Sequence, residues 1–267
     1  MIWLNEGLRP AGAGAISAAD RGFTLGDGLF ETLRCREGEP LHLDAHLARL
    51  AEGAAVLGIA LPLPPAGLAG AMRATLAANG LSTAALRLTL TRGPGPRGLL
   101  PPAAPNPTLL ITAAPLPPPL PPARLITATV TRRNQCSPLS RIKSLNYLDN
   151  ILARMEAQRA GADDALLLNT LGLVAETSVA NLFALVNGAL LTPPLADGAL
   201  PGVMRGRVIM TGGAAERSLM PADLAGASEI FLTNSLGIRP VGALDGRPVG
   251  DGNPGDCAAG LLRSLCA

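Results

Sequence analysis

The sequence predicts a two-domain protein of the α+β class, and three observations support this prediction. The 267 residues suffice for two modest domains, since domains usually run to about 100 to 200 residues. The segment 113–123 is rich in proline, which fixes an extended backbone with few hydrogen bonds, so it is expected to link the domains. Strand and helix patterns alternate on both sides of it. We therefore expect a small N-terminal domain over 1–112 and a larger mixed domain over 124–267.

The elements of the N-terminal domain follow from hydrophobic periodicity and turn residues. An alternating run over 30–35 predicts a strand, and the sequence EGEP at 37–40 predicts a hairpin turn after it. Asp44 is a good N-cap for an apolar-periodic helix that runs to about Leu57. By the same criteria, the further expected elements are strands at 2–4, 85–91 and 108–112 and a helix at 66–79.

In the larger domain, turn signals again separate the expected elements. The pair Asn187-Gly188 predicts a hairpin of strands at 179–186 and 189–192. The pair Pro201-Gly202 precedes a helix expected at 203–211. The remaining expected elements are strands at 125–131, 165–168 and 229–233 and a helix at 147–159.

Composition excludes several classes of function. A net charge of +2 with 2% aromatic residues gives neither a basic surface nor stacking platforms, so we expect no nucleic-acid partner. No apolar run approaches the roughly 20 residues of a membrane helix, and the N-terminus lacks a basic segment followed by an apolar one. We expect a soluble, cytoplasmic protein with no membrane partner.

The cysteines and histidines give little material for a metal site or a disulfide framework. The cysteines are scattered without CxxC spacing, so free structural thiols are expected; they are Cys35, Cys136, Cys257 and Cys266. His42 and His46 are four positions apart and could share a helix face, but a third ligand is missing. A role at the helix start explains these histidines as well, and we expect no metal.

Lys143 is the one lysine among 22 basic residues, the rest being arginine. A guanidinium is effectively always protonated, whereas a lysine amine can lose its proton and condense with a carbonyl. Lys143 is therefore the first candidate for a Schiff-base residue. The alternative is that an arginine-rich composition left one surface lysine by accident.

A pyridoxal-type enzyme would also need an anion site and a carboxylate facing a pyridine nitrogen. Arg49, on the helix after Asp44, could bind a phosphate through two donors, although a solvated helix arginine is the alternative. Glu176 stands where a strand leaves a turn, and a carboxylate there would keep a pyridinium protonated. The helix start at Gly202 and the turn at 233–237 could bind phosphate through backbone and side-chain donors, or could be ordinary capping and turn chemistry.

Taken together, these motifs resemble the fold type IV pyridoxal-phosphate enzymes, the class IV aminotransferase family. The family includes branched-chain and D-amino-acid aminotransferases and aminodeoxychorismate lyase. The resemblance covers nearly the whole chain, through segments at 20–34, 46–50, 91–98, 142–148, 176–183, 202–205 and 234–235. It implies a two-domain fold with a smaller N-terminal domain, a barrel-like core in the larger one, and a homodimer.

The resemblance also implies roles for individual residues. Lys143 would bind pyridoxal 5'-phosphate as a Schiff base and later move protons, and Glu176 would face the pyridine nitrogen. Tyr147 would reach the phenolic oxygen, or else is a core tyrosine at a helix start. The residues implied in phosphate binding are Arg49, Val203, Met204, Asn234 and Ser235.

The residues that touch substrate decide the reaction. D-amino-acid aminotransferases bind the substrate carboxylate with an arginine and a histidine two positions apart, whereas this chain has Arg97 and Leu99. The turn Asn234-Ser235 and the position of Thr32 resemble aminodeoxychorismate lyase, which releases 4-aminobenzoate and pyruvate. The resemblance therefore favours the lyase. A class IV transaminase is the alternative, and a non-catalytic protein that only binds the cofactor is a minor one.

Four residues are expected to contact the substrate of either enzyme. Phe30 and Thr32 belong to a segment that the family shares, and Arg92 and Arg97 are expected to bind a substrate carboxylate. A protein that only stored the cofactor would have no need for these two arginines. Their alternative is an ordinary solvated loop position.

Overall fold

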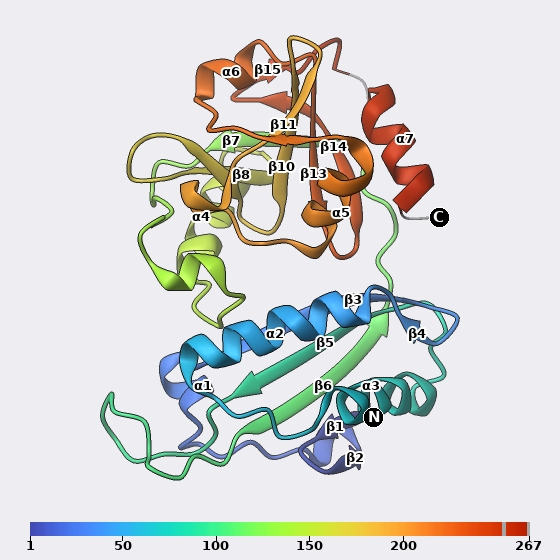
Figure 1. The fold of residues 1–267 in the computed structure, drawn as a ribbon, viewed down its shortest axis with the longest axis vertical. Helices are drawn as coiled ribbons and strands as arrows, with labels where there is room; N and C mark the ends of the chain where they lie inside the picture. Colours follow the sequence, from blue (N-terminus) through green and yellow to red (C-terminus); the bar gives the residue numbers. More distant parts are fainter. Residues whose placement is uncertain (253–254, 266–267) are drawn as a thin grey trace. The chain divides into compact units, whose positions relative to one another are not determined.

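The computed structural model describes residues 1–252 and 255–265, so Cys266 lies outside the described residues. The chain divides into two compact units (Figure 1). Unit 1 contains Met1–Pro117 and Ile142–Asn146, and unit 2 contains Pro118–Arg141 and Tyr147–Ala267. The boundary falls inside the predicted linker. The short segment Ile142–Asn146, expected in the second domain, groups with unit 1 instead.

Unit 1 is built on a six-stranded sheet in which every pair of neighbours is antiparallel. The strand order is β2-β1-β6-β5-β3-β4. Its strands are β1 (Ile2–Leu4), β2 (Gly7–Arg9), β3 (Gly28–Arg36), β4 (Glu39–Pro40), β5 (Ala84–Thr91) and β6 (Thr108–Pro115). The turn between β3 and β4 has positive φ at Glu37 and Gly38, as the predicted hairpin requires.

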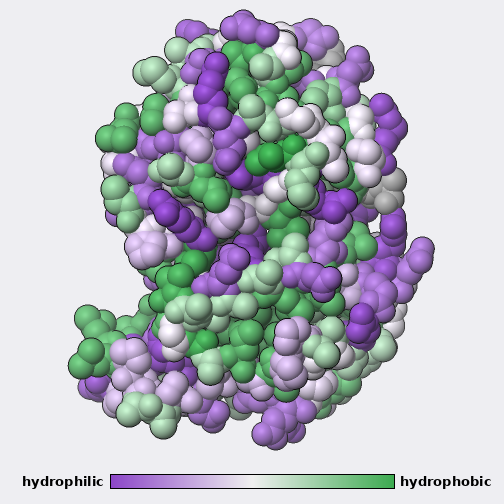
Figure 2. Space-filling model, in the orientation of Figure 1, coloured by the Kyte–Doolittle hydropathy of each residue, from purple (hydrophilic) through white to green (hydrophobic). Residues whose placement is uncertain are grey.

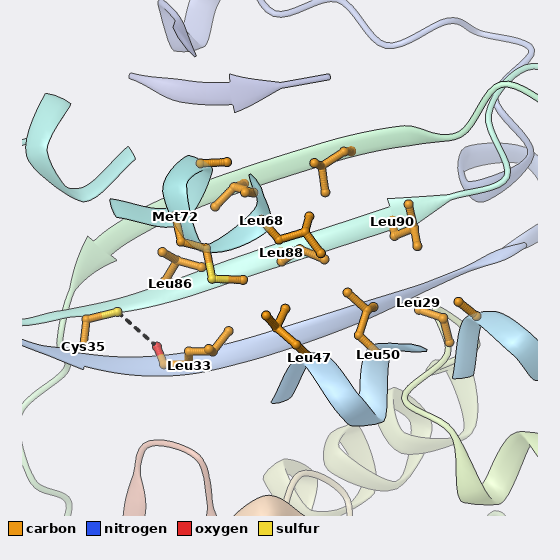
Figure 3. Packing of buried hydrophobic residues seen from close by; sticks show 14 of the residues in the cluster. Leu29, Leu33, Cys35, Leu47, Leu50, Leu68, Met72, Leu86, Leu88 and Leu90 are labelled. Atoms are coloured by element: carbon orange, nitrogen blue, oxygen red, sulfur yellow. Dashed lines mark hydrogen bonds between the residues drawn. The ribbon is translucent and has the colours of Figure 1, made fainter. Parts of the chain in front are cut away.

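Two helices, α2 (Leu43–Leu57) and α3 (Pro65–Ala78), pack against the sheet and close one hydrophobic core (Figure 3). Because side chains alternate along a strand, Leu29, Leu33 and Cys35 of β3 share the face that meets the helices. Leucines at alternate positions of β5 complete this layer. Burial raises the pKa of the Cys35 thiol to about 11, which makes it an unreactive core residue.

A buried ionic cluster fixes the loops at one end of the unit 1 sheet. Asp27 accepts hydrogen bonds from Arg21 of α1 (Arg21–Leu25) at 2.8 Å and from Arg92 at 2.7 Å. Arg92 also donates to the carbonyl oxygens of Leu57 and Gly58, where α2 ends. Burial raises the pKa of the Asp27 carboxyl, but the bonds and charges of the two arginines outweigh this and hold it below its ordinary value.

Arg21 also holds the loop between β5 and β6. Its guanidinium donates to the carbonyl oxygens of Gly98 at 2.9 Å and Leu99 at 2.7 Å. The side chains of Leu99 and Leu100 are more than 80% exposed, and hydrophobic groups gather at the surface over this loop (Figure 2, lower left). The backbone of the loop is therefore anchored while its side chains face outward.

Unit 2 contains a nine-stranded curled sheet. The path runs β12-β11-β10-β13-β14-β7-β8-β9, with β15 paired to β14, and β9 also lies beside β10, which curls the sheet back on itself. Its core is lined by Leu125, Leu166, Leu182 and Leu232, among others. The strands are β7 (Ala123–Thr127), β8 (Asp164–Leu168), β9 (Val174–Thr177), β10 (Asn181–Val186), β11 (Ala189–Thr192), β12 (Ala215–Glu216), β13 (Glu229–Asn234), β14 (Gly237–Leu244) and β15 (Arg247–Pro248).

Helices cover the outside of this sheet. Helix α4 (Leu148–Arg159) packs small residues, Ala153 and Ala157, against β8. Helices α5 (Val203–Gly212) and α7 (Asp256–Leu265) share a core with Phe183 and Phe231, whose rings stack 5.2 Å apart. The remaining helical segments are α6 (Pro221–Ala225) and the 3-10 turns η1 (Ala11–Ala13), η2 (Pro138–Arg141) and η3 (Leu195–Asp197).

Most expected elements are present, with differences that have local causes. The predicted cap at Asp44 is wrong: His42, with φ of 55°, is the N-cap, and Asp44 lies in the first turn, where its carboxylate favours the helix dipole. The strand expected at 125–131 ends at Thr127, and β6 continues to Pro115. Strands β2, β12, β14 and β15 and helices α1, α6 and α7 were not predicted, and β9 was expected only as a strand leaving the turn before Glu176. Within 1–252 and 255–265, no helix has the length and apolar character needed to cross a bilayer.

We predict that Asp27→Asn lowers the free energy of unfolding by about 2 to 4 kcal/mol at pH 7, because two buried guanidinium groups lose their counter-ion. The pKa of Asp27 is lowered in the folded state, so its stabilisation is present above about pH 4 and is lost as pH falls further. Urea unfolding of both proteins at pH 7 and pH 3 measures this. Glu39→Gln, which breaks an exposed pair with Arg73, is the matched control and should cost less than about 1 kcal/mol. An equal loss in the two variants at pH 7 would contradict the prediction.

Candidate active site

Lys143 lies in a turn that follows η2, just before Ser144 forms a β-bridge with Leu29 of β3. Phe30 N donates to Lys143 O and Leu145 N donates to Gly28 O, each at 2.9 Å. Ile142 and Ser144, on either side of the lysine, are buried. A Cβ at Gly28 would collide with Leu90 O and Leu145, so glycine is required for this close approach. The lysine backbone is therefore held on unit 1 while its half-buried side chain projects from it.

The face of the sheet opposite the helices carries a cationic cluster around Phe30. Lys143 Nζ lies 4.4 Å from the centroid of the Phe30 ring, and Arg87 Cζ lies 3.9 Å from it. These distances add to 8.3 Å, which is the greatest possible separation of the two cationic groups. Thr32 is the cross-strand partner of Arg87. Phe30 thus contacts both Lys143 and Arg87, an arginine that sequence reasoning missed, and Thr32 lies beside Arg87.

Arg49, on α2, lies on the helix-covered face of β3, in a buried cluster with Glu31 and His46. Its Nε and Nη2 donate to the two oxygens of Glu31 at 2.8 and 2.6 Å, and His46 Nδ1 lies 2.7 Å from the same carboxylate. Burial raises the pKa of the Glu31 carboxyl, but hydrogen bonds from His46 and Arg49 outweigh this and hold it below its ordinary value. The structure thus gives Arg49 a carboxylate partner within unit 1, and its predicted phosphate contact stays a prediction.

The two arginines expected to contact substrate have different environments. Arg92 is 5% exposed and belongs to the Asp27 cluster, where it ties the sheet to the end of α2. Arg97 is exposed and lies just before the Gly98–Leu100 carbonyls that Arg21 holds. Of the two, only Arg97 presents its side chain to solvent. The hydrogen bonds of Arg92 hold the loop at Asp27 to the end of α2.

In unit 2, Glu176 is buried on β9 and held by several donors. Its Oε2 accepts hydrogen bonds from Leu200 N at 3.0 Å and from Asn181 Nδ2 at 3.2 Å. Its Oε1 lies 3.1 Å from Arg133 Nη2. Arg133 was not predicted as a site residue. Its contact with Glu176 depends on β8, β9 and the loop at Gly198, which are distant from it in sequence.

Next to Glu176, the first turn of α5 forms a site suited to an anion. A helix leaves its first N-H groups without intrahelical partners, and here these include Val203 and Met204. A Cβ at the N-cap Gly202 would collide with Asn181 Oδ1, so the N-cap itself must be small. Thr233, paired with Asn181 across β10 and β13, has a buried hydroxyl oxygen without a hydrogen-bond partner.

The other predicted cofactor residues lie at the ends of unit 2 elements. Asn234 ends β13, and its Oδ1 accepts from Leu236 N at 2.9 Å, which shapes the turn that contains Ser235. Tyr147 is the N-cap of α4 and is half-buried. Thr233, whose hydroxyl is buried, directly precedes Asn234 and Ser235, the two residues predicted to bind phosphate. The sequence signal for this region was a threonine at the end of a strand, followed by a turn that begins with asparagine.

These groups fit the requirements of a pyridoxal-phosphate cofactor. The orphaned Thr233 hydroxyl and the N-H groups at the start of α5 suit a phosphate, and Glu176 suits a ring nitrogen. Lys143 supplies an amine in unit 1. The chain thus carries an anion site, a buried carboxylate and an amine.

Comparison with known sequences places the chain in a family. The model of amino-transferase class IV matches residues 28–244. The chain is 36% identical to a Methanocaldococcus jannaschii protein with the provisional name branched-chain-amino-acid aminotransferase, over 96% of this chain and 91% of that protein. It is 31% identical to a D-alanine aminotransferase of Bacillus licheniformis, over 94% and 90%. It is 30% identical to an aminodeoxychorismate lyase of Vibrio harveyi, over 91% of each.

Solved structures agree with this assignment. The branched-chain amino acid aminotransferase of Escherichia coli superposes with a TM-score of 0.94 at 25% identity, over 99% of this chain and 93% of that chain. The T.th. branched-chain amino acid aminotransferase, complexed with N-(5'-phosphopyridoxyl)-L-glutamate, gives 0.91 at 29% identity, over 98% and 91%. With the family match spanning most of the sequence, the chain belongs to the class IV aminotransferases, a family of pyridoxal-phosphate-dependent enzymes.

Proposed function

We propose that this enzyme is a transaminase that moves an amino group from a branched-chain L-amino acid to 2-oxoglutarate. The observation that carries the proposal is the cluster of Lys143, Phe30 and Arg87 on one sheet face. The similarity to branched-chain aminotransferases, in sequence and in fold, supports it. The prediction that favoured the lyase therefore loses support to the transaminase alternative, although a lyase is also among the relatives.

The residues would divide the chemistry between them. Bound pyridoxal phosphate supplies a ring that accepts the electron pair released at the aminated carbon. The Lys143 amine would hold the cofactor and move protons, since it is the chain's one amine side chain. Glu176 would face the ring nitrogen. The N-H groups of Val203 and Met204, with Asn234, Ser235 and Arg49, would bind the phosphate.

Arg87 would select the dicarboxylic partner of the reaction. Its guanidinium lies within 8.3 Å of Lys143 Nζ, because both groups contact the same phenyl ring. The distal carboxyl carbon of 2-oxoglutarate or glutamate is three C-C bonds, about 4 Å, from the reacting carbon. A substrate whose reacting carbon lies at Lys143 could therefore reach Arg87. The phosphopyridoxyl-glutamate complex of the T.th. relative agrees with such a substrate.

We also propose that the enzyme pairs with a second copy of itself through α4. Four apolar side chains spaced along one side of this helix are 43–74% exposed: Leu148, Ile151, Leu152 and Met155. Such a stripe is typical of a helix that packs against another surface. In an antiparallel pair centred on Ile151 and Leu152, Asp149 would oppose the partner's Arg154. The stripe is thus complementary to itself in hydrophobicity, whereas Arg154 and Asp149 already contact Asp164 and Thr131 within their own chain.

The reaction can be tested with the cofactor-loaded protein and three substrates. We expect branched-chain L-amino acids with 2-oxoglutarate to give the branched 2-oxo acids, measured by chromatography. D-alanine and aminodeoxychorismate are supplied in separate reactions. Formation of 4-aminobenzoate and pyruvate from aminodeoxychorismate, with no branched 2-oxo acid from the branched-chain amino acids, would favour the lyase instead. Lys143→Arg keeps the charge but should lose both turnover and the visible absorbance of the lysine-linked cofactor.

The role of Arg87 predicts a selective loss. Arg87→Met should lower kcat/KM for 2-oxoglutarate by about 10- to 100-fold, the worth of one charge-assisted contact, and leave pyruvate, a monocarboxylic acceptor, within about threefold. Arg36→Met, at the exposed end of β3, is the control and should change neither. An equal loss of kcat/KM for 2-oxoglutarate and pyruvate would show that Arg87 does not bind the distal carboxylate.

The self-association surface predicts a change in mass. Sedimentation velocity should give a dimer for the parent and a monomer for Leu152→Glu, because a carboxylate would be buried in the apolar stripe. Met210→Glu replaces an equally apolar residue, 75% exposed on α5, and should remain dimeric. A dimeric Leu152→Glu protein would place the interface elsewhere.

A further inference from the structure

We propose that Arg133 is a positioning residue that keeps Glu176 ionised and directed toward the ring nitrogen of the cofactor. This inference rests on the proposed role of Glu176 and extends it to a residue outside the expected site. It concerns unit 2 alone, since Arg133 and Glu176 belong to the same unit. The two side chains form a largely buried ion pair, 16% and 7% exposed.

Three donors hold the carboxylate of Glu176. The Oε2 atom accepts from Leu200 N and Asn181 Nδ2, which fixes the plane of the carboxylate against the loop before α5. Arg133 Nη2 lies on the opposite oxygen, Oε1, at 3.1 Å. The amide donors are neutral, so among these partners the positive charge comes from Arg133.

Arg133 is itself held by several hydrogen bonds. Its Nε donates to Gly198 O at 3.0 Å, its Nη2 to Ser140 O at 3.1 Å, and its backbone N to Leu168 O at 2.8 Å. Gly198 has φ of 98°, and a Cβ there would lie 2.9 Å from Arg133 Cγ. The turn at Gly198 is thus shaped around the arginine, which has little freedom to leave Glu176.

The charge of Arg133 favours the ionised form of Glu176. A carboxylate buried without a cation takes up a proton, because the charged form is penalised by the apolar surroundings. A neutral Glu176 could not form an ion pair with a protonated ring nitrogen, and the ring would accept electrons less readily. Arg133 therefore acts on the cofactor through Glu176 and without touching it.

The test separates the ring nitrogen from the rest of the cofactor. The apo forms of the parent, Arg133→Met, Arg133→Lys and Glu176→Gln are titrated with pyridoxal phosphate and with its carbocyclic analogue, in which C-H replaces the ring nitrogen. Both ligands keep the aldehyde and the phosphate. Dissociation constants are measured by absorbance, and circular dichroism checks that each variant is folded.

We expect the parent to prefer pyridoxal phosphate over the analogue by at least about tenfold, the worth of one ion pair. Arg133→Met should lose most of this preference by weakening pyridoxal phosphate alone. Arg133→Lys, which keeps the charge, should retain most of it. If Arg133→Met does not fold, Arg133→Gln takes its place, because it keeps hydrogen bonding without charge and should behave as Arg133→Met.

Two results would overturn the inference. One is a parent-like preference in Arg133→Met or Arg133→Gln, and the other is an equal weakening of both ligands, which marks Arg133 as a merely structural residue. The role of Glu176 is tested separately by Glu176→Gln. If that variant keeps the preference, the proposed contact of Glu176 with the ring nitrogen is itself wrong.

Discussion

The backbone pairing of Lys143 with β3 is the constraint on which the chemistry of unit 1 depends. Two hydrogen bonds join the lysine segment to Gly28 and Phe30, and the buried side chain of Ile142 anchors it in the core. The chain reaches this position from unit 2 and returns to unit 2 four residues later. A reactive amine on a flexible side chain is thereby carried by a backbone that cannot drift, which is what a residue that must meet the same atom at each turnover requires.

The alternation of β3 distributes charge between the two faces of the unit 1 sheet. Glu31 points toward the helices and neutralises Arg49, while Phe30 and Thr32 point to the opposite face with Arg87. A slip of one residue would exchange these sets and would place a carboxylate beside the lysine. The register of β3 therefore determines which charges face the lysine as well as which side chains enter the core. Its pairing with β5 over eight residues fixes this register.

Much of this could be predicted from the sequence, and the remainder depended on tertiary contacts. Strands and helices with clear periodicity, such as β3 and α3, were predicted within a residue or two. Lys143 and Glu176 stood out by rarity and by motif spacing. The partner of Arg49 did not, because an ion pair between a strand and a helix leaves no periodic trace. Arg87 and Arg133 were missed for the same reason: each is defined by what it contacts across the fold.

The discontinuity of unit 1 limits how this protein can be taken apart. Five residues of that unit, the lysine segment 142–146, are encoded in the middle of the other, so a single cut after Pro117 keeps both sheets whole but removes the lysine from unit 1. An exchange of either half with a relative would give a hybrid whose lysine comes from one parent and whose supporting strand comes from the other. Only parents with matching edges at β3 would give an active hybrid. Because residues 142–146 pair with β3 of unit 1, the two units have to be inherited together.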